Sequence, residues 1–460
     1  TNPAIATIHQ SVKVDADASV ETINVVGIPS ILTLIKMPSK SSGAAIGGSF
    51  SGIIYNNSAE AWIDDGVTIN AEQDISVTAD VKNFAVNIAE SGANASKFAV
   101  TGVVSYNDFE SAATAYIEDE VILEAGRDLL VSAKTDTLGV IIAGGMVKGG
   151  QAGIGATAVI NLVNGTTTAF IGDLEPYTPV VAGSIIAGRD LTVTAENIEK
   201  LFSISIAGAL AGSSSSTPST GDESSPQDSM GVDTSGSTSS DGSGAADGTQ
   251  GSAGIGISGD VAINDINATT EAYIADVDNV DVGDALVILA DHEAMMLTVA
   301  GAVALELSKS SGGVAIAGSF TLNDIDRTVQ AYTKNTTITA TDIMIKAHTQ
   351  DRMISVTAGG AAAPRQGVLA VFGSANVNLI DTTTSARADE DSDLSASGDV
   401  EVDSEADLDL ISVAGGFSLA EQVGIGAAAD VGVFHIAVES LVAETAAITA
   451  DGDVLITAAS

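Results

Sequence analysis

The sequence of 460 residues contains no cysteine. Disulfide bonds and thiolate metal sites are therefore excluded, and the redox compartment cannot be read from the composition. Aromatic residues are also scarce, because Phe, Tyr and Trp together make up 4% of the chain while glycine alone contributes 48 residues. Small side chains allow backbone layers to approach closely, so the composition predicts a core of thin, closely spaced layers.

Basic residues are few as well, with 17 Lys and Arg against 60 Asp and Glu and a net charge of −43. Such a chain repels phosphate backbones and anionic lipid, which excludes nucleic acid as a partner. The longest apolar stretches, such as 138–147, are too short for a membrane-spanning helix, so we expect no membrane insertion. The carboxylates have two explanations, which are solubility of a β-rich array and binding of Ca²⁺ by oxygen ligands.

A motif of the form A-Y-I recurs along the chain and marks a repeat. Its alanine falls at Ala61, Ala115, Ala169, Ala272, Ala331 and Ala386, with intervals of 54, 54, 103, 59 and 55 residues. The long interval contains two insertions, around 175–182 and at 213–252, and about 54 residues remain without them. A fixed period of this size is typical of a repeat protein in which neighbouring units stack.

The segments between these markers alternate apolar with polar or small residues, as in "GRDLLVSA" at 126–133 and "LFSISIAGAL" at 201–210. A period of two indicates half-buried strands, and no helical stripe or cap accompanies it. The Gly-Asp and Gly-Arg pairs that precede several segments indicate corners. The sequence therefore predicts an all-β chain.

We predict a β-solenoid, a right-handed parallel β-helix of about seven repeats, that covers residues 1–212 and continues over 253–460. The Ser/Gly/Asp-rich tract 213–252 has the composition of a disordered insertion. The period leaves the coil size open: one coil of 54 residues must be flattened into two sheets, while two or three coils per repeat are more compact. Tandem β-sandwiches are the alternative fold, because two repeats make a domain-sized unit.

Asparagine occupies the position eight residues before the marker in five repeats. Because Asn tolerates the backbone of a tight bend and identical Asn side chains can stack, we interpret these positions as structural corners. The five residues are Asn107, Asn161, Asn264, Asn323 and Asn378.

The same segments contain the best candidate for a metal site, because Asn323, Asp324 and Asp326 lie close together in sequence and Ca²⁺ binds through oxygen ligands. No cofactor is required by the pattern, and Ca²⁺ is the one that the composition allows. The segments lack the glycine-rich nonapeptide of calcium-binding β-rolls and the spacing of an EF-hand. This Ca²⁺ site is a hypothesis beside the structural interpretation.

Catalytic patterns are weak throughout. The four histidines lie at unrelated phases of the repeat and lack zinc-binding spacing, so we interpret them as surface or edge residues: His9, His292, His348 and His435. Paired carboxylates are uninformative in so acidic a chain. We therefore predict no enzyme, and a carbohydrate-active β-solenoid is kept as the alternative, since such enzymes need acid, base and cationic residues clustered on one face.

The repeated motifs N-x-x-[ND]-x-T-x-x-A-Y-I, A-G-x-D-L-x-V-x-A and G-I-G-A resemble those of very large bacterial surface proteins and filamentous-haemagglutinin-like adhesins. The resemblance covers nearly the whole chain outside the Ser-rich tract. It implies a secreted, extracellular or cell-surface β-solenoid that forms a stalk or fibre, and it supplies no catalytic residues. A calcium-binding matrix or filament protein is a further alternative.

The leading hypothesis is thus a structural or adhesive module. The partners expected for it are glycans of a host, a neighbouring cell or the matrix, or further copies of the chain in a fibre. The chain begins at Thr1 without a signal peptide and ends on a copy of an internal motif, so we expect it to belong to a longer protein.

Overall fold

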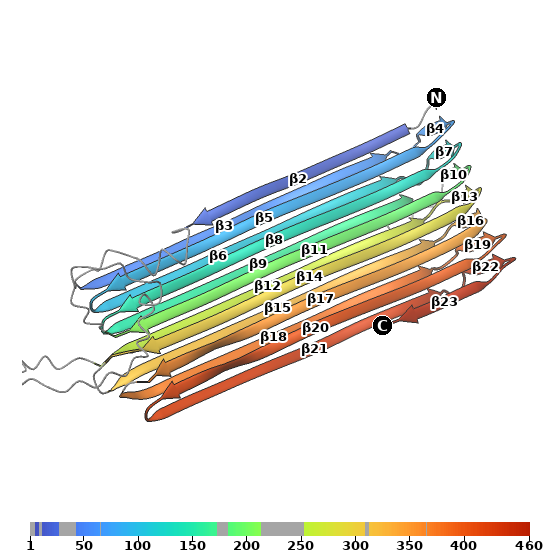
Figure 1. Cartoon of the computed structure of the whole chain (residues 1–460). Helices are drawn as coiled ribbons and strands as arrows, with labels where there is room; N and C mark the ends of the chain where they lie inside the picture. Colours follow the sequence, from blue (N-terminus) through green and yellow to red (C-terminus); the bar gives the residue numbers. More distant parts are fainter. Residues whose placement is uncertain are drawn as a thin grey trace, which may run out of the picture.

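The structure, a computed structural model, describes residues 5–8, 12–26, 43–64, 66–172, 183–212, 253–308, 312–364 and 366–460. These ranges contain strands and turns and no helix. Three strands recur in each repeat, in the order of one short strand, one long strand and a second long strand that runs back (Figure 1).

The strands form three parallel sheets, one for each position in the repeat. Sheet A consists of short strands of four residues: β1 (Ile5–Ile8), β4 (Thr68–Ala71), β7 (Ile122–Ala125), β10 (Ser184–Ala187), β13 (Asn279–Val282), β16 (Thr337–Ala340), β19 (Asp393–Ala396) and β22 (Ala447–Ala450). Sheet B contains β2 (Val12–Val26), β5 (Ile75–Ala95), β8 (Leu129–Gly149), β11 (Leu191–Ala211), β14 (Ala285–Glu306), β17 (Asp342–Ala363), β20 (Val400–Ala420) and β23 (Val454–Ala459). Sheet C contains β3 (Ala44–Ile63), β6 (Phe98–Ile117), β9 (Ala152–Gly172), β12 (Ile255–Ala275), β15 (Gly313–Lys334), β18 (Gly367–Ala388) and β21 (Val423–Val442).

Each repeat forms one coil. In sheet C, Asn107 pairs with Asn161 and Asn264 pairs with Asn323, so the spacing between hydrogen-bonded neighbours equals the repeat period read from the sequence. A complete long strand has 20 to 22 residues, which corresponds to about 70 Å at about 3.3 Å per residue. The coil is therefore wide and flat, with sheets B and C stacked face to face and sheet A along one narrow edge (Figure 1). The predicted all-β solenoid is confirmed, and tandem sandwiches are wrong because the same three sheets continue through every coil.

The edge opposite sheet A, where each strand of sheet B turns back into sheet C, is here called the β-arch end. The tract 213–252 falls in the connection from β11 to β12 at this end and lies outside the described residues. The insertion at 175–182 falls in the connection from β9 to β10, between sheets C and A, and also lies outside the described residues. β9 and β12 nevertheless pair over their whole length without a register shift.

The predicted alternation is confirmed along the long strands, whose residues are buried and partly exposed in turn. In the half of the coil next to sheet A, the inward positions are Ile, Val, Leu and Ala and form one cluster through all coils. In the half near the β-arch end, many inward positions are Ala, Gly, Ser, Thr or Asn, which makes the interior there small and polar.

The Gly-Arg and Gly-Asp pairs form the predicted corners between sheets A and B. A Cβ atom on Gly126 would lie 2.3 Å from the carbonyl oxygen of Glu72 in the preceding coil, and one on Gly188 would lie 2.4 Å from that of Gly126. Because backbones of successive coils approach this closely at the corner, only glycine fits.

Candidate functional site

The five asparagines of the repeat form a continuous ladder inside the solenoid. All five are fully buried and point inward from the middle of the sheet C strands. The side-chain Nδ2 of each donates to Oδ1 of the next: Asn107 to Asn161 at 2.8 Å, Asn161 to Asn264 at 2.7 Å, Asn264 to Asn323 at 2.7 Å and Asn323 to Asn378 at 2.7 Å.

Hydroxyl groups of sheet B complete the ladder. Asn264 Nδ2 also donates to Thr298 Oγ1 at 2.9 Å, and Asn323 Nδ2 donates to Ser355 Oγ at 3.0 Å. Each central amide thus has partners for its oxygen and its nitrogen, which a buried amide needs. The side chains stack as expected, but the corner assignment is wrong, because these positions lie within long strands and none has positive φ.

The three residues of the predicted Ca²⁺ site do not converge. Asn323 points into the interior, whereas Asp324 and Asp326 are both exposed on the outer face of β15. Neighbouring residues of a strand point to opposite faces, so one ion cannot contact Asn323 together with the two carboxylates. Within the described ranges, no group of three or more His, Asp or Glu side chains has metal-binding geometry. The predicted site is therefore wrong as a set.

A cluster of ionisable side chains lies inside the solenoid, at residues for which we predicted no site from the sequence. It contains Glu199 on β11, His292 on β14, Arg327 on β15 and Asp351 on β17, all inward-facing. Arg327 Nη1 lies 2.5 Å from Asp351 Oδ2, and the two side chains are 3% and 6% exposed. Asn197 Nδ2 donates to Glu199 Oε1 at 3.3 Å.

Burial dominates the ionisation of this cluster. It raises the pKa of Glu199 to about 7, although the charge of Arg327 and the bond from Asn197 act in the opposite direction. It also raises the pKa of Asp351 against the lowering effect of Arg327, and it lowers the pKa of His292, with the charge of Arg327 as the second cause. An acid with a pKa near neutrality beside a cation suits acid–base chemistry, but sheets B and C cover these groups and leave no surface for a substrate.

The expectation that the histidines lie at the surface holds for two of the four. His348 lies on the outer face of sheet B with Nδ1 2.7 Å from Asp291 Oδ1, and His435 is exposed on β21. His292 is fully buried, so that prediction is wrong for it, and His9 falls outside the described residues.

The raised pKa of Glu199 predicts a pH-dependent stability. A carboxyl group whose pKa is higher in the folded state stabilises the fold fully below its unfolded pKa of about 4.5, and this contribution is lost as the pH rises through about 7. Glutamine stays neutral, so Glu199→Gln is expected to be more favourable at pH 8 than at pH 4. The change that the substitution causes in the free energy of unfolding should be about 3 kcal/mol more positive at pH 8, from about 1.4 kcal/mol per pKa unit. Urea unfolding at both pH values measures this difference.

The matched control is Glu293→Gln on the outer face of β14, where the side chain is exposed. It removes the same charge from the chain without removing a buried one. If both variants change the pH dependence equally, net charge causes the effect and the burial of Glu199 does not.

The aromatic position of the A-Y-I motif forms a second ladder, on the outer face of sheet C near sheet A. The ladder consists of Trp62, Tyr116, Phe170, Tyr273 and Tyr332, and successive rings are stacked with centroids 4.7 to 6.1 Å apart. The Arg387 guanidinium lies 5.4 Å from the centroid of the last ring, Tyr332. Each stacked pair is worth about 0.5–1.5 kcal/mol beyond its buried area. Because the rings between the ends cover one another's faces, this ladder stabilises the coil and does not offer a row of ring faces to a sugar.

The described part of the chain holds no helix able to cross a membrane. Comparisons with known proteins find no matching protein family, no matching curated protein and no matching solved structure.

Proposed function

We propose that the chain is a non-catalytic structural and adhesive segment of an extracellular or cell-surface protein. The observation that supports this is the continuous hydrogen-bonded pairing of neighbouring strands in all three sheets from the first described coil to the last. Each coil is hydrogen-bonded to the next along its full width, as in the 21 residue pairs between β11 and β14. Such an array transmits force as one body, and its acidic, cysteine-free composition suits an exposed surface.

The coil geometry makes this segment a broad column and not a slender stalk. Each coil of about 54 residues adds only about 4.8 Å of height, while its long strands are about 70 Å wide. An extended chain covers about 3.3 Å per residue, so a protein that only needs length reaches it with far fewer residues than this solenoid uses. The geometry therefore supports a stiff column whose two broad faces serve for contact with other molecules.

The structural part of the proposal is tested by pulling the chain from its two ends in a force microscope. Coils are expected to detach one at a time, each releasing about 54 residues or about 180 Å of extended chain, except the coil with the two insertions, which spans 103 residues and should release about 340 Å. The shorter spacing should recur in all other events, because those coils have nearly the same length and the same contacts. A single event that releases most of the chain would contradict a segmented load-bearing column.

The adhesive part is tested with immobilised glycans and an assay for released reducing ends. We expect binding to some cell-surface or matrix glycans without cleavage, and a chelator should leave this binding unchanged. An unrelated protein of similar net charge controls for ionic adsorption. Release of sugar would instead support the carbohydrate-active alternative, and loss of binding with chelator would support a calcium-dependent matrix protein.

A further inference from the structure

Sheet C carries a charge-free area on its outer face near the β-arch end. On β12 the outward residues there are Ile255, Ile257, Gly259, Val261 and Ile263, and the register places five corresponding residues on each of the six other strands. None of these 35 residues, five on each of seven strands, is charged, and the Tyr106 hydroxyl is the only polar side-chain group among them. Since 17% of the chain is charged, this area, here called the apolar face, is a marked departure from the rest of the surface.

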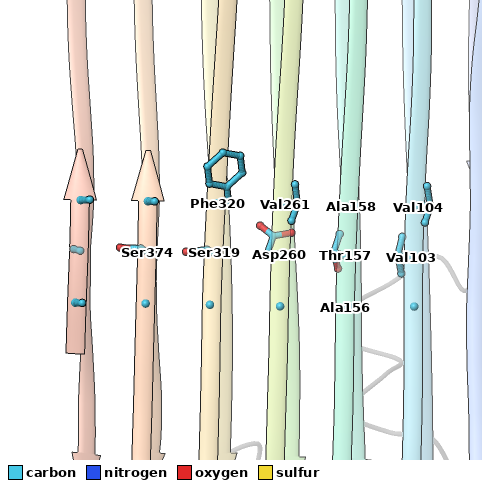
Figure 2. Close-up of a pocket in the computed structure, with 18 residues that line it drawn as sticks. Val103, Val104, Ala156, Thr157, Ala158, Asp260, Val261, Ser319, Phe320 and Ser374 are labelled. Carbon is cyan, nitrogen blue, oxygen red and sulfur yellow. The ribbon is translucent and has the colours of Figure 1, made fainter. Parts of the chain in front are cut away.

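A shallow groove crosses the apolar face from coil to coil. The middle of the five outward positions is glycine or alanine on every strand, as in Gly259 and Gly318, and the outward residue before it is Ile or Val on every strand. Figure 2 shows Phe320 standing beside this groove, with Val261 at the same level on the next strand. The face therefore has both a ridge and a hollow.

The area of the apolar face matches that of a protein interface. Five outward positions at about 6.6 Å spacing and seven strands at about 4.8 Å spacing cover about 1,000 Å². The largest apolar patch on a typical monomer is about 300–600 Å², and a standard interface takes about 800 Å² from each partner. This face is large enough to bind a partner of protein size.

We propose that the partner is a second copy of this chain, packed sheet C against sheet C through the apolar face. Two chains with a net charge of −43 repel each other, so close contact between copies is favoured only where neither contributes carboxylates. The outer face of sheet B has apolar positions too, but Lys148 and Lys200 interrupt it. The spacing between strands is the same in both copies, so the rows of side chains on one face fit between the rows of side chains on the other. The pairing rests on the fold alone and is independent of the proposed adhesive function.

The charges beyond the apolar face determine how the copies are oriented. Toward sheet A, the same outer face carries Asp265, Asp324, Asp326 and Asp381 at adjacent positions. A two-fold axis parallel to the strands would place these carboxylates opposite the same carboxylates of the second chain. A two-fold axis parallel to the solenoid axis makes the strands of the two copies antiparallel, so that only the apolar halves overlap and the acidic halves project on opposite sides. The second arrangement also allows Phe320 of each copy to pack over the glycine groove of the other.

The first test is the mass in solution. Light scattering of the intact chain is expected to give twice the chain mass of 45.8 kDa at concentrations of about 10 μM, and Val261→Lys is expected to give single chains. Val261 is 37% exposed, so this change leaves the core intact, which circular dichroism and the melting temperature verify. Thr269→Lys adds the same charge on the outer face of the same strand outside the apolar face, and it should leave the dimer intact.

The second test is cross-linking, which is clean because the chain has no cysteine. A Cβ atom on Gly259 meets no atom within 4 Å, so Gly259→Cys fits. A short bismaleimide should couple this variant into dimers and should not couple Thr269→Cys, which lies about 33 Å away along β12. Efficient coupling of Thr269→Cys would overturn the antiparallel arrangement.

Three further results would overturn the pairing itself. One is an intact chain that remains monomeric at about 100 μM, a concentration well above the micromolar range of weak interfaces. Another is a dimer that survives Val261→Lys and dissociates with Ile204→Lys, because Ile204 lies on the outer face of sheet B. The third is a monomer that binds phosphatidylcholine vesicles and loses this binding with Val261→Lys, which assigns the apolar face to lipid.

Discussion

Asn264→Asp is expected to lower the free energy of unfolding at pH 8 by about 4 kcal/mol, the range in which a buried charge loses its partner. The two side chains have nearly the same shape, but a carboxylate cannot donate a hydrogen bond. Asn323 Oδ1 and Thr298 Oγ1, at 2.7 Å and 2.9 Å from Asn264 Nδ2, then face an acceptor in place of a donor. Leaving a buried polar group unsatisfied costs about 1–3 kcal/mol, and the enclosed negative charge adds to it.

The same chain offers a control three residues away. Asn267 lies on the outer face of β12, where its Nδ2 donates to Asp265 Oδ1 at 3.0 Å, and it is exposed. Asn267→Asp adds the same charge at the surface and is expected to cost less than about 1 kcal/mol. Urea unfolding followed by circular dichroism compares the two variants. Burial raises the pKa of a carboxyl group, so Asn264→Asp should regain stability as the pH falls, and equal losses in the two variants would show that the ladder contributes little.

The repeat spacing in the sequence predicted the coil stacking well. The intervals of 103, 59 and 55 residues between markers recur as the separations of hydrogen-bonded asparagines in the ladder. This agreement follows from strand pairing, because insertions such as 175–182 and 213–252 lengthen the connections and leave the paired positions unchanged. The alternation of apolar residues likewise predicted the strands and their two faces.

The size of the coil could not be predicted. A period of 54 residues fits one wide coil or two or three narrow ones, and both choices satisfy the same alternation. The role of the asparagines depended on this choice. Asn is depleted from strands and favoured in bends, so local preference indicated a corner, but one coil per repeat places identical amides about 4.8 Å apart, where they can bond to each other.

Counting positions along a strand could have identified part of the candidate site. Arg327 is four residues after Asn323 and Glu199 is four after Ala195, so both share a face with buried residues. The same count separates Asn323 from Asp324 and argues against the metal site. It could not show that Arg327 meets Asp351, because that contact joins sheet C to sheet B and depends on how the chain turns at the β-arch end.

Arg327→Met is expected to destabilise the fold by about 3–5 kcal/mol, the cost of breaking a buried ion pair. The Arg327 guanidinium pairs with Asp351, and its charge lowers the pKa of both Asp351 and Glu199, so its loss removes the favourable counter-charge of two carboxyl groups in the interior. Replacing both members of the pair, as in Arg327→Met with Asp351→Leu, should restore stability to within about 1 kcal/mol of the original chain or above it, because well-packed apolar side chains need no counter-charge.

Arg352→Met is the matched control, since Arg352 lies at the surface with Nε 3.5 Å from Asp409 Oδ2 and both side chains are more than half exposed. Exposed pairs contribute about 0–1 kcal/mol, so this change should be nearly neutral. Urea unfolding of the single and double variants gives the coupling energy between Arg327 and Asp351. The double variant contains no Asp351 carboxylate, so an unpaired charge at that position cannot destabilise it. If it is nevertheless as unstable as Arg327→Met, the loss of stability comes from altered packing around residue 327, and the charge pair has little effect.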